Sequence, residues 1–351
     1  MWFSLTAGSA PTIPNKTKCA SSNDCILGSV CDVQNGICFW QIPIPTSGKY
    51  RVDAGGSTSF TFPFLPNGES VVWSGNIGIC TEGTCDNSNS TICDLQGCST
   101  RGPGALAEFT LGLKGVDFYD ISIIGGSQTV SMEFTPVLPK NVSADPALPY
   151  NCGNPGGRVP RISSLPESNW TFSPPRIEYT AVTPASPRQT CAGTSDCTAP
   201  FRCGYAPALS GQSLELVCGT LQGYYTPGAI CDHDPTNAIV NCTSPLGAPD
   251  TGLVVNNLYQ CDAGLGSCYQ NGAQSGCCGC ADWPTAPPST QKCANKNPLW
   301  VAIVEPQLLW LKHAVPTAYT FPFDDMSSTF VCSSINASGI NVLAYNINLC
   351  V

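Results

Sequence analysis

The chain contains 23 cysteines in 351 residues, and they are spread over almost its whole length. Cysteines at this density form disulfides, which persist only in an oxidising compartment, so the sequence predicts a secreted, extracellular protein. A reduced zinc protein is the alternative. Zinc modules usually bring paired CxxC or Cys/His spacings, and this chain has only two histidines, His233 and His313. We therefore expect no metal and no cofactor.

The remaining bulk properties exclude two further classes of partner. The net charge is −9, whereas nucleic-acid binding needs clustered Lys and Arg, so no nucleic acid is expected. The most apolar run, Leu299–Leu311, is interrupted by Glu305 and Pro306 and is too short to span a bilayer. The first residues, MWFSLTAGSAPT, lack the features of a signal peptide. We expect a secretion leader to lie outside the given sequence or to have been removed.

Six N-x-S/T sequons add to the prediction of secretion. Each is weak evidence alone, but six of them in a cysteine-rich chain indicate a glycoprotein that carries N-linked glycans on surface loops. The acceptor residues are Asn15, Asn89, Asn141, Asn169, Asn241 and Asn336.

The first 38 residues divide into an arm and a small cysteine module. Residues 1–18 open with a short strand-like piece that Gly8 and Pro11 end. This strand belongs either to its own domain or, as a donor strand, to the sheet edge of a neighbouring molecule. Residues 19–38 begin with CASSNDCILGSVC, and residues 191–203 repeat the pattern as CAGTSDCTAPFRC. Both copies read C-A-x-x-x-D-C-x5-C, and we interpret both as disulfide staples.

The segment Arg101–Pro136 predicts three strands joined by glycine-containing turns. FTLGL, FYDISII and SMEFTP carry apolar residues at period two, as half-buried strands of a sandwich do. The strands hold four acids, Glu108, Asp117, Asp120 and Glu133. The sequence therefore predicts an acidic groove on a β-rich block, which begins at residue 39.

The second half of the chain predicts an insertion and a return to the sheet. Residues 136–187 contain eleven prolines and little periodicity, and residues 188–293 contain twelve cysteines, so we expect a disulfide-dependent lobe with at most short helices. Pro306 favours a short helix over Gln307–His313. AYTFPF, SSTFVC and INVLAYNINLCV then predict strands that rejoin the first sheet.

Several segments, in order, resemble the thaumatin-like family of the pathogenesis-related group 5 type. They are VVWSGNIGIC, LAEFTL, DFYDISII and SMEFTP in the first half, and GCCGCADW and PTAYTFPFDDMSSTFVC in the second. The resemblance covers residues 50–136 and 276–351 well, residues 188–275 loosely, and residues 1–38 hardly at all. It implies a mainly β fold, a thaumatin-like β-sandwich with an inserted disulfide-rich lobe. The expected organisation is an N-terminal arm (1–18), a small Cys module (19–38), a sandwich core (39–150 plus 294–351) and the inserted lobe (151–293).

The resemblance also implies an acidic cleft that binds carbohydrate. By motif position its residues are Arg101, Glu108, Asp120, Glu133 and Asp324, with Glu133 standing where the family is expected to have Asp, and with Asp117 left out. The local disulfides Cys80–Cys85 and Cys93–Cys98 and the long-range disulfide Cys152–Cys332 are implied in the same way. The family pairs its last cysteine, here Cys350, with one near the N-terminus. Cys19, Cys25, Cys31 and Cys38 compete for that place, so one of these five cysteines is expected to be free or bonded to another molecule.

Two functions follow as hypotheses. The first is a secreted glycoprotein that binds β-glucan or another surface carbohydrate through the acidic cleft. Weak endo-β-1,3-glucanase activity is implied only by resemblance, with Glu108 and Asp120 as the candidate catalytic pair. The second is a structural subunit of an extracellular fibre or coat, which assembles with copies of itself through N-terminal strand donation.

Overall fold

The computed structural model describes most of the chain outside several loops. The described residues are 2–7, 12–25, 29–41, 49–59, 73–80, 93–94, 97–98, 104–113, 116–128, 131–140, 144–145, 147–157, 179–210, 213–246, 252–262, 265–266, 268, 277–283, 293, 297–333, 335–336, 339–340 and 344–349. The protein is mainly β, with several antiparallel sheets and many disulfides, as the sequence predicts.

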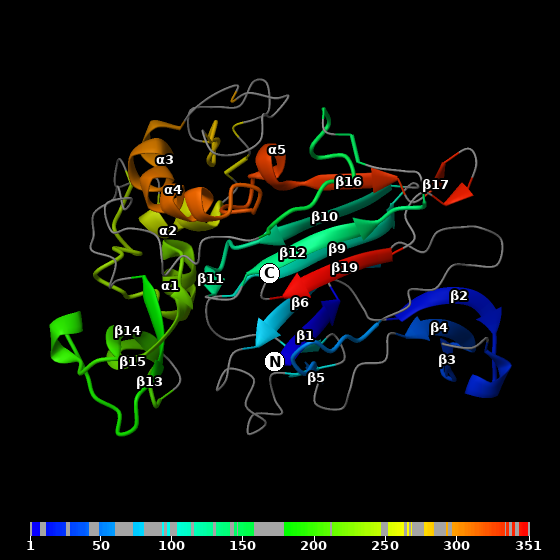
Figure 1. Ribbon diagram of the computed structural model, residues 1–351, viewed down its shortest axis with the longest axis horizontal. Coiled ribbons are helices and arrows are strands. Elements are labelled where there is room, and N and C mark those ends of the chain that lie inside the picture. The colour runs from blue at the N-terminus through cyan, green and yellow to red at the C-terminus, as the bar shows by residue number, and fades with distance from the viewer. Residues whose placement is uncertain are drawn as a thin grey trace.

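A six-stranded sheet forms the centre of the molecule (Figure 1). Its order is β16-β10-β9-β6-β1-β5, and every neighbouring pair is antiparallel. The strands are β1 (Trp2–Ala7), β5 (Lys49–Arg51), β6 (Trp73–Cys80), β9 (Leu106–Leu113), β10 (Val116–Ser122) and β16 (Phe330–Ser333). The sequence predicted β9 and β10 from their alternation, and the tail rejoins this sheet through β16. The expectation that INVLAYNINLCV also rejoins it is wrong, because Ala344–Leu349 pairs with Met132–Val137 instead.

One face of this sheet packs against a second, two-stranded sheet. That sheet pairs β12 (Met132–Val137) with β19 (Ala344–Leu349). Phe134 of β12 lies 5.0 Å from Tyr119 of β10 and 5.9 Å from Phe109 of β9, measured between ring centroids. All three rings are buried, so alternate residues of β9, β10 and β12 face a shared aromatic core.

The first strand lies inside the chain's own sheet. β1 pairs with β6 over six residues and with β5 on its other side. Of the two expectations for this arm, the structure has the strand in its own domain, where both edges are hydrogen-bonded. AYTFPF, by contrast, was predicted wrongly as a strand. Its Tyr319 makes only an isolated bridge to Ser122, and the Asp-Met-Ser-Ser that follows turns into the short helix α5 (Asp325–Ser328).

The two cysteine repeats fold as copies of one module. The first Cys module (residues 19–38) contains a 3-10 turn and the hairpin of β3 (Ser29–Asp32) and β4 (Ile37–Gln41), flanked by β2 (Thr12–Lys18). The second Cys module (residues 191–218) contains the same turn and the hairpin of β14 (Arg202–Pro207) and β15 (Leu214–Tyr224), flanked by β13 (Thr180–Pro184). The pairing is also the same: first cysteine to third, second to fourth, as Cys19–Cys31 and Cys25–Cys38, and as Cys191–Cys203 and Cys197–Cys218.

The conserved spacing of the aspartate in each repeat has a structural cause. Asp24 accepts hydrogen bonds at 2.8 Å from the backbone N–H groups of Ala20 and Ser21. Asp196 does the same for Ala192 and Gly193. These bonds to the ionised form lower the pKa of both carboxyls. The sulfurs that cluster in each module are all in disulfides, so they are staples and not metal ligands.

The inserted lobe contains short helices and shares its core with the sheet. The helices within the expected bounds of the lobe are α1 (Pro227–His233) and α2 (Val255–Gln260), and α3 (Pro298–Ile303) and α4 (Glu305–Ala314) follow directly after it. The predicted helix over Gln307–His313 is therefore confirmed, with α4 one turn longer.

The remaining strands are short. β11 (Ser127–Gln128) pairs with β15. Two small antiparallel pairs join β7 (Cys93–Asp94) to β8 (Gly97–Cys98) and β17 (Ile335–Asn336) to β18 (Gly339–Ile340).

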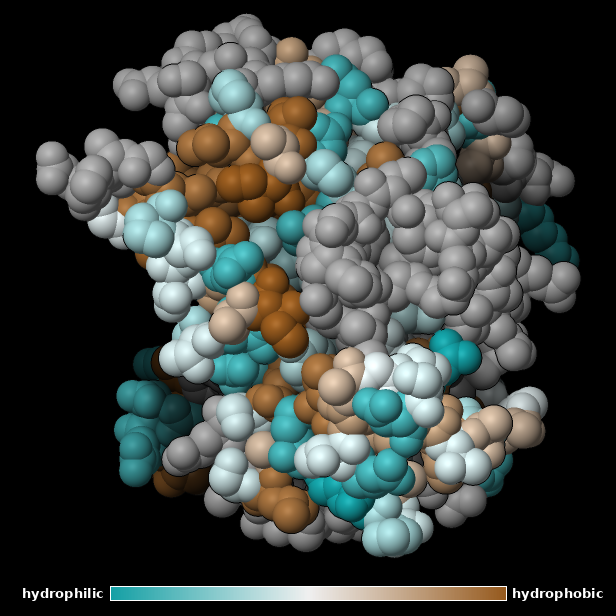
Figure 2. Space-filling model, turned by 90° about the vertical axis from the view of Figure 1, so that its left-hand side faces the viewer, coloured by the Kyte–Doolittle hydropathy of each residue, from teal (hydrophilic) through white to brown (hydrophobic). Residues whose placement is uncertain are grey.

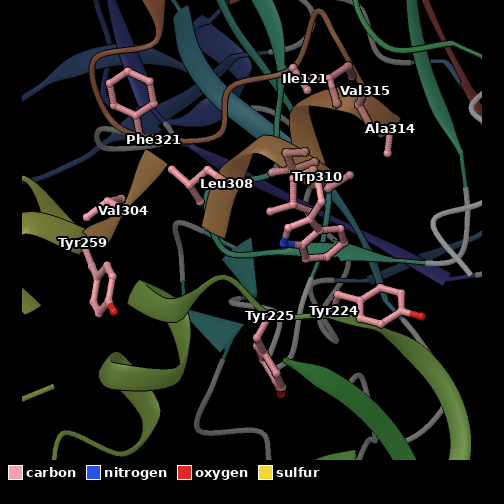
Figure 3. Close-up of a cluster of buried hydrophobic side chains, with 14 of the residues drawn as sticks. Ile121, Tyr224, Tyr225, Tyr259, Val304, Leu308, Trp310, Ala314, Val315 and Phe321 are labelled. Atoms are coloured by element: carbon pink, nitrogen blue, oxygen red, sulfur yellow. The ribbon is translucent and has the colours of Figure 1, made fainter. Parts of the chain in front are cut away.

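Helix α4 joins the lobe to the sheet (Figure 3). Its Leu308 and Trp310 lie among Ile121 of β10 and the lobe residues Tyr224 and Tyr259, in one continuous buried cluster. Trp310 meets Tyr224 edge to face at 5.3 Å. Sheet and lobe therefore share one hydrophobic core.

Gly279, in the GCCGC run, packs against helix α3. A Cβ atom at Gly279 would stand 2.0 Å from the ring of Trp300 in α3, so only glycine fits there. Trp300 is completely buried, and its ring packs in a tilted arrangement against Phe321, with 4.8 Å between the ring centroids. Among the described residues, no helix is long and apolar enough to cross a membrane.

The position of β1 can be tested with proline. Ser4 pairs with Lys49 of β5 and with Gly78 of β6, so Ser4→Pro removes a ladder hydrogen bond from an interior strand whichever neighbour its N–H faces, and should lower the thermal midpoint by several degrees. Thr58→Pro, in the exposed loop after β5, is the matched control and should leave the midpoint within about one degree. Equal melting of the two variants, followed by scanning calorimetry, would contradict the interior position of β1.

Candidate functional site

Three polar side chains form a row across neighbouring strands of the central sheet. Asn76 of β6 stands opposite Glu108 of β9, and Glu108 stands opposite Asp120 of β10. The flanking residues on each strand, such as Phe109 and Tyr119, are buried in the aromatic core. Because side chains alternate along a strand, this row faces away from that core. The sheet therefore brings together two of the predicted cleft acids.

The row lines a pocket of about 280 Å³. A second row beside it supplies Ser74, Thr110 and Phe118, which are also opposite one another in the ladder. The hydroxyls of Ser74 and Thr110 are hydrogen-bonded to each other. Besides the core residue Phe109, the pocket lining offers two carboxyls, an amide, two hydroxyls and the ring of Phe118.

Both carboxyls are poorly solvated. Burial raises the pKa of Asp120 well above its ordinary value, and the nearby charges of Glu108 and Asp325 raise it further. Burial also raises the pKa of Glu108, and a hydrogen bond from the Ser122 hydroxyl partly offsets this. The Oδ1 atom of Asp120 is buried and accepts no hydrogen bond. An unsatisfied buried acceptor of this kind is costly, so the pocket has an unmet need for a donor.

Asp325 is the acid that the sequence did not select. It begins α5, is exposed, and accepts a hydrogen bond at 2.9 Å from the Tyr319 hydroxyl. Burial, followed by the charges of Asp325 and Asp120, raises the pKa of that tyrosine. The only sequence feature that points to Asp325 is its position next to Asp324, the residue of the pair that the motif assigns to the cleft.

Asp324, the predicted fifth cleft residue, is fully buried and does not line the pocket. It forms an ion pair with Lys312 at 2.7 Å, and both side chains have no exposed surface. Trp283 donates its indole N–H to Asp324 at 2.8 Å, and Thr320 donates through its backbone and hydroxyl. The prediction of a cleft role for Asp324 is therefore corrected: the structure gives it a place in the core.

Glu133 lies on the opposite side of the molecule from the pocket. It alternates in β12 with Met132 and Phe134, which are buried against the central sheet. Glu133 therefore points away from that sheet, and it accepts a hydrogen bond from Thr135. The structure does not bring it to Glu108 and Asp120. Arg101 falls outside the described residues.

The acid that the sequence left out also faces the core. Asp117 is buried and accepts a hydrogen bond at 2.8 Å from the Tyr345 hydroxyl. This supports leaving Asp117 out of the groove.

The predicted disulfide Cys152–Cys332 is present. Cys93 and Cys98 stand opposite each other in the pairing of β7 with β8. The predicted bonds Cys80–Cys85 and Cys93–Cys98 and the bonding of Cys350 involve side chains outside the described residues. Since the first Cys module pairs its four cysteines internally, Cys350 has no partner there.

Of the six sequons, Asn241 has a described side chain, and it is exposed. The other acceptors, Asn15, Asn89, Asn141, Asn169 and Asn336, have side chains outside the described residues.

The end of the molecule that carries the inserted lobe has a different surface. Figure 2 shows apolar side chains gathered in its upper part, at the level of α3 and α4. Leu299 of α3 is an exposed large apolar residue, at 46%. Nothing in the described part of the chain indicates what would cover this surface, so it suggests no particular partner.

Comparison with known proteins adds no family assignment. No family model matches the chain, and no curated protein matches it either. The resemblance to thaumatin-like proteins therefore stays a prediction from the motifs.

The buried ion pair can be tested by removing its cation. Lys312→Met leaves Asp324 charged and unpaired in the core, and should lower the free energy of unfolding by about 3–5 kcal/mol. Adding Asp324→Asn should recover a substantial part of that loss, because the amide keeps an acceptor for Trp283 without a charge. Denaturant unfolding of both variants measures this. A double variant no more stable than Lys312→Met would contradict the ion pair.

The pocket carboxyls should make stability depend on pH. The pKa of Asp120 is raised in the folded state above its ordinary value of 3.8. As pH rises, Asp120 therefore ionises first in the unfolded chain. The folded state loses stability over the pH range that begins at 3.8 and extends upward. Asp120→Asn removes this loss. The variant should match the wild type near pH 4 and become increasingly more stable towards neutral pH. Urea unfolding at several pH values measures the difference in the free energy of unfolding between the variant and the wild type. A difference that stays constant over this range would contradict a raised pKa of Asp120 in the folded state.

Proposed function

We propose that the protein is a secreted carbohydrate-binding glycoprotein that holds β-glucan or another surface carbohydrate in the pocket between Asn76 and Asp120. The observation that carries the proposal is the composition of this pocket. Carboxyls and an amide can bind sugar hydroxyls, and Phe118 offers a flat apolar surface for the C–H face of a sugar ring. The many disulfides support an extracellular location.

The same geometry favours binding over hydrolysis. Glycoside hydrolysis needs one carboxyl that stays protonated and another that stays ionised, so their pKa values must be pushed apart. Here burial raises the pKa of both Glu108 and Asp120, and none of the described lining residues is a cation that would keep one of the two ionised. We therefore propose no catalytic role for this pair. The thaumatin-like sandwich, with its cleft, remains the fold that the motifs favour.

Self-assembly through strand donation has less support. Within the described residues, β1 already has a hydrogen-bonded neighbour on each side in its own sheet. A donated strand would have to displace it, and no described contact favours that exchange. We therefore retain the fibre or coat subunit only as the alternative function.

A pull-down on insoluble polysaccharides tests the proposal. The wild type should be retained on β-1,3-glucan or on another wall polysaccharide, and Glu108→Gln with Asp120→Asn should weaken retention by about tenfold or more, because two acceptors lose their charge. The matched control is Asp145→Asn with Asp232→Asn, which removes two charges from exposed positions away from the pocket. Equal retention of the two double variants would refute the pocket as the binding site.

A further inference from the structure

The pocket has an acceptor without a donor. Asp120 lines it, and the Oδ1 atom of this residue is buried and receives no hydrogen bond from the protein. Its cross-strand neighbour Glu108 is also a carboxyl. Like charges directly opposite each other in a ladder are destabilising. A ligand that brings both a hydrogen-bond donor and a positive charge would relieve both defects at once.

Among the described residues, the charges at the pocket are all negative. Glu108 and Asp120 line it, and Asp325 lies close enough to act on Asp120 electrostatically. None of the described lining residues carries a positive charge. A neutral sugar could satisfy the free oxygen, but it would leave the two opposed carboxyls uncompensated. A cation would satisfy the oxygen and offset the charge.

We propose that the pocket selects a cationic sugar, a 2-amino-2-deoxyhexose unit of a deacetylated, chitosan-like polymer, over neutral or N-acetylated sugars. This rests on the proposed carbohydrate function and names its ligand class. The ammonium group carries three donors and no acceptor, which matches a site made of acceptors. It would bind between Asp120 and Glu108, while Phe118 packs against the ring. At about 280 Å³ the pocket is just below the usual range for small-molecule sites, so it suits one sugar ring.

Binding of this ligand is coupled to protons. The raised pKa values of Asp120 and Glu108 mean that the empty pocket holds protons at mildly acidic pH. The ammonium ion takes the place of a carboxyl proton, which goes to solvent. Affinity should therefore rise from about pH 4 as the carboxyls ionise, and fall again at higher pH once the amino group of the sugar loses its own proton. A neutral sugar would show a weaker dependence.

Three tetrasaccharides separate the ligand classes by titration calorimetry: tetra-glucosamine, its fully N-acetylated counterpart and a β-1,3-linked glucose tetramer. Wild type should bind tetra-glucosamine about tenfold more tightly than the other two, as one charge-assisted hydrogen bond provides. Asp120→Asn should remove this preference. Asp232→Asn, an exposed acid on α1, is the matched control and should keep it. Thermal melts verify that Asp120→Asn is folded.

The outcomes separate this inference from the proposed function. Preference for tetra-glucosamine that depends on Asp120 supports it. Equal or tighter binding of the glucose tetramer, or a preference that survives in Asp120→Asn, overturns it while carbohydrate binding stands. Binding of none of the three sugars to folded wild type overturns both.

Discussion

The buried ion pair of Lys312 and Asp324 fixes the geometry on which the site depends. Lys312 is in α4, which shares its core with the inserted lobe, and Asp324 immediately precedes α5. The Lys312 ammonium also donates to Ser327 and Ser328, both in α5. This network holds α5 against α4, and thereby sets Asp325 beside the pocket. A single buried cation thus links the lobe to the acidic face of the sheet.

Local sequence predicted the strands of the site but not which acids would meet. The alternation of LAEFTL and DFYDISII is sufficient to place Glu108 and Asp120 on one face of their strands. The choice between Asp324 and Asp325 is different, because the two are adjacent and identical in type. It is decided by Lys312, twelve residues earlier in the chain, which captures Asp324 in the core. No local pattern carries that information.

Glu133 illustrates the same limit at the level of sheets. Its alternation with Met132 and Phe134 correctly predicts a strand with one buried face. The pattern does not say which sheet the strand joins. β12 leaves β9 and β10 and pairs with β19, more than two hundred residues later, so its polar face turns away from the pocket. The Cys modules were more predictable. Because the same cysteine spacing occurs twice in the chain, the sequence indicates two disulfide modules of one kind, although it does not say which cysteines pair within each.

The two kinds of buried acid in this protein make the strongest case for a function at the pocket. Asp324 is surrounded by a cation and by indole, hydroxyl and amide donors, which is what a structural carboxylate requires. The Oδ1 atom of Asp120 is buried beside another acid and has no donor. A pair like this lowers stability at neutral pH, and an apolar pair would fit the sheet better. The same fold therefore satisfies one buried acid fully and leaves the other open towards a pocket, and a ligand is the simplest physical reason for the difference.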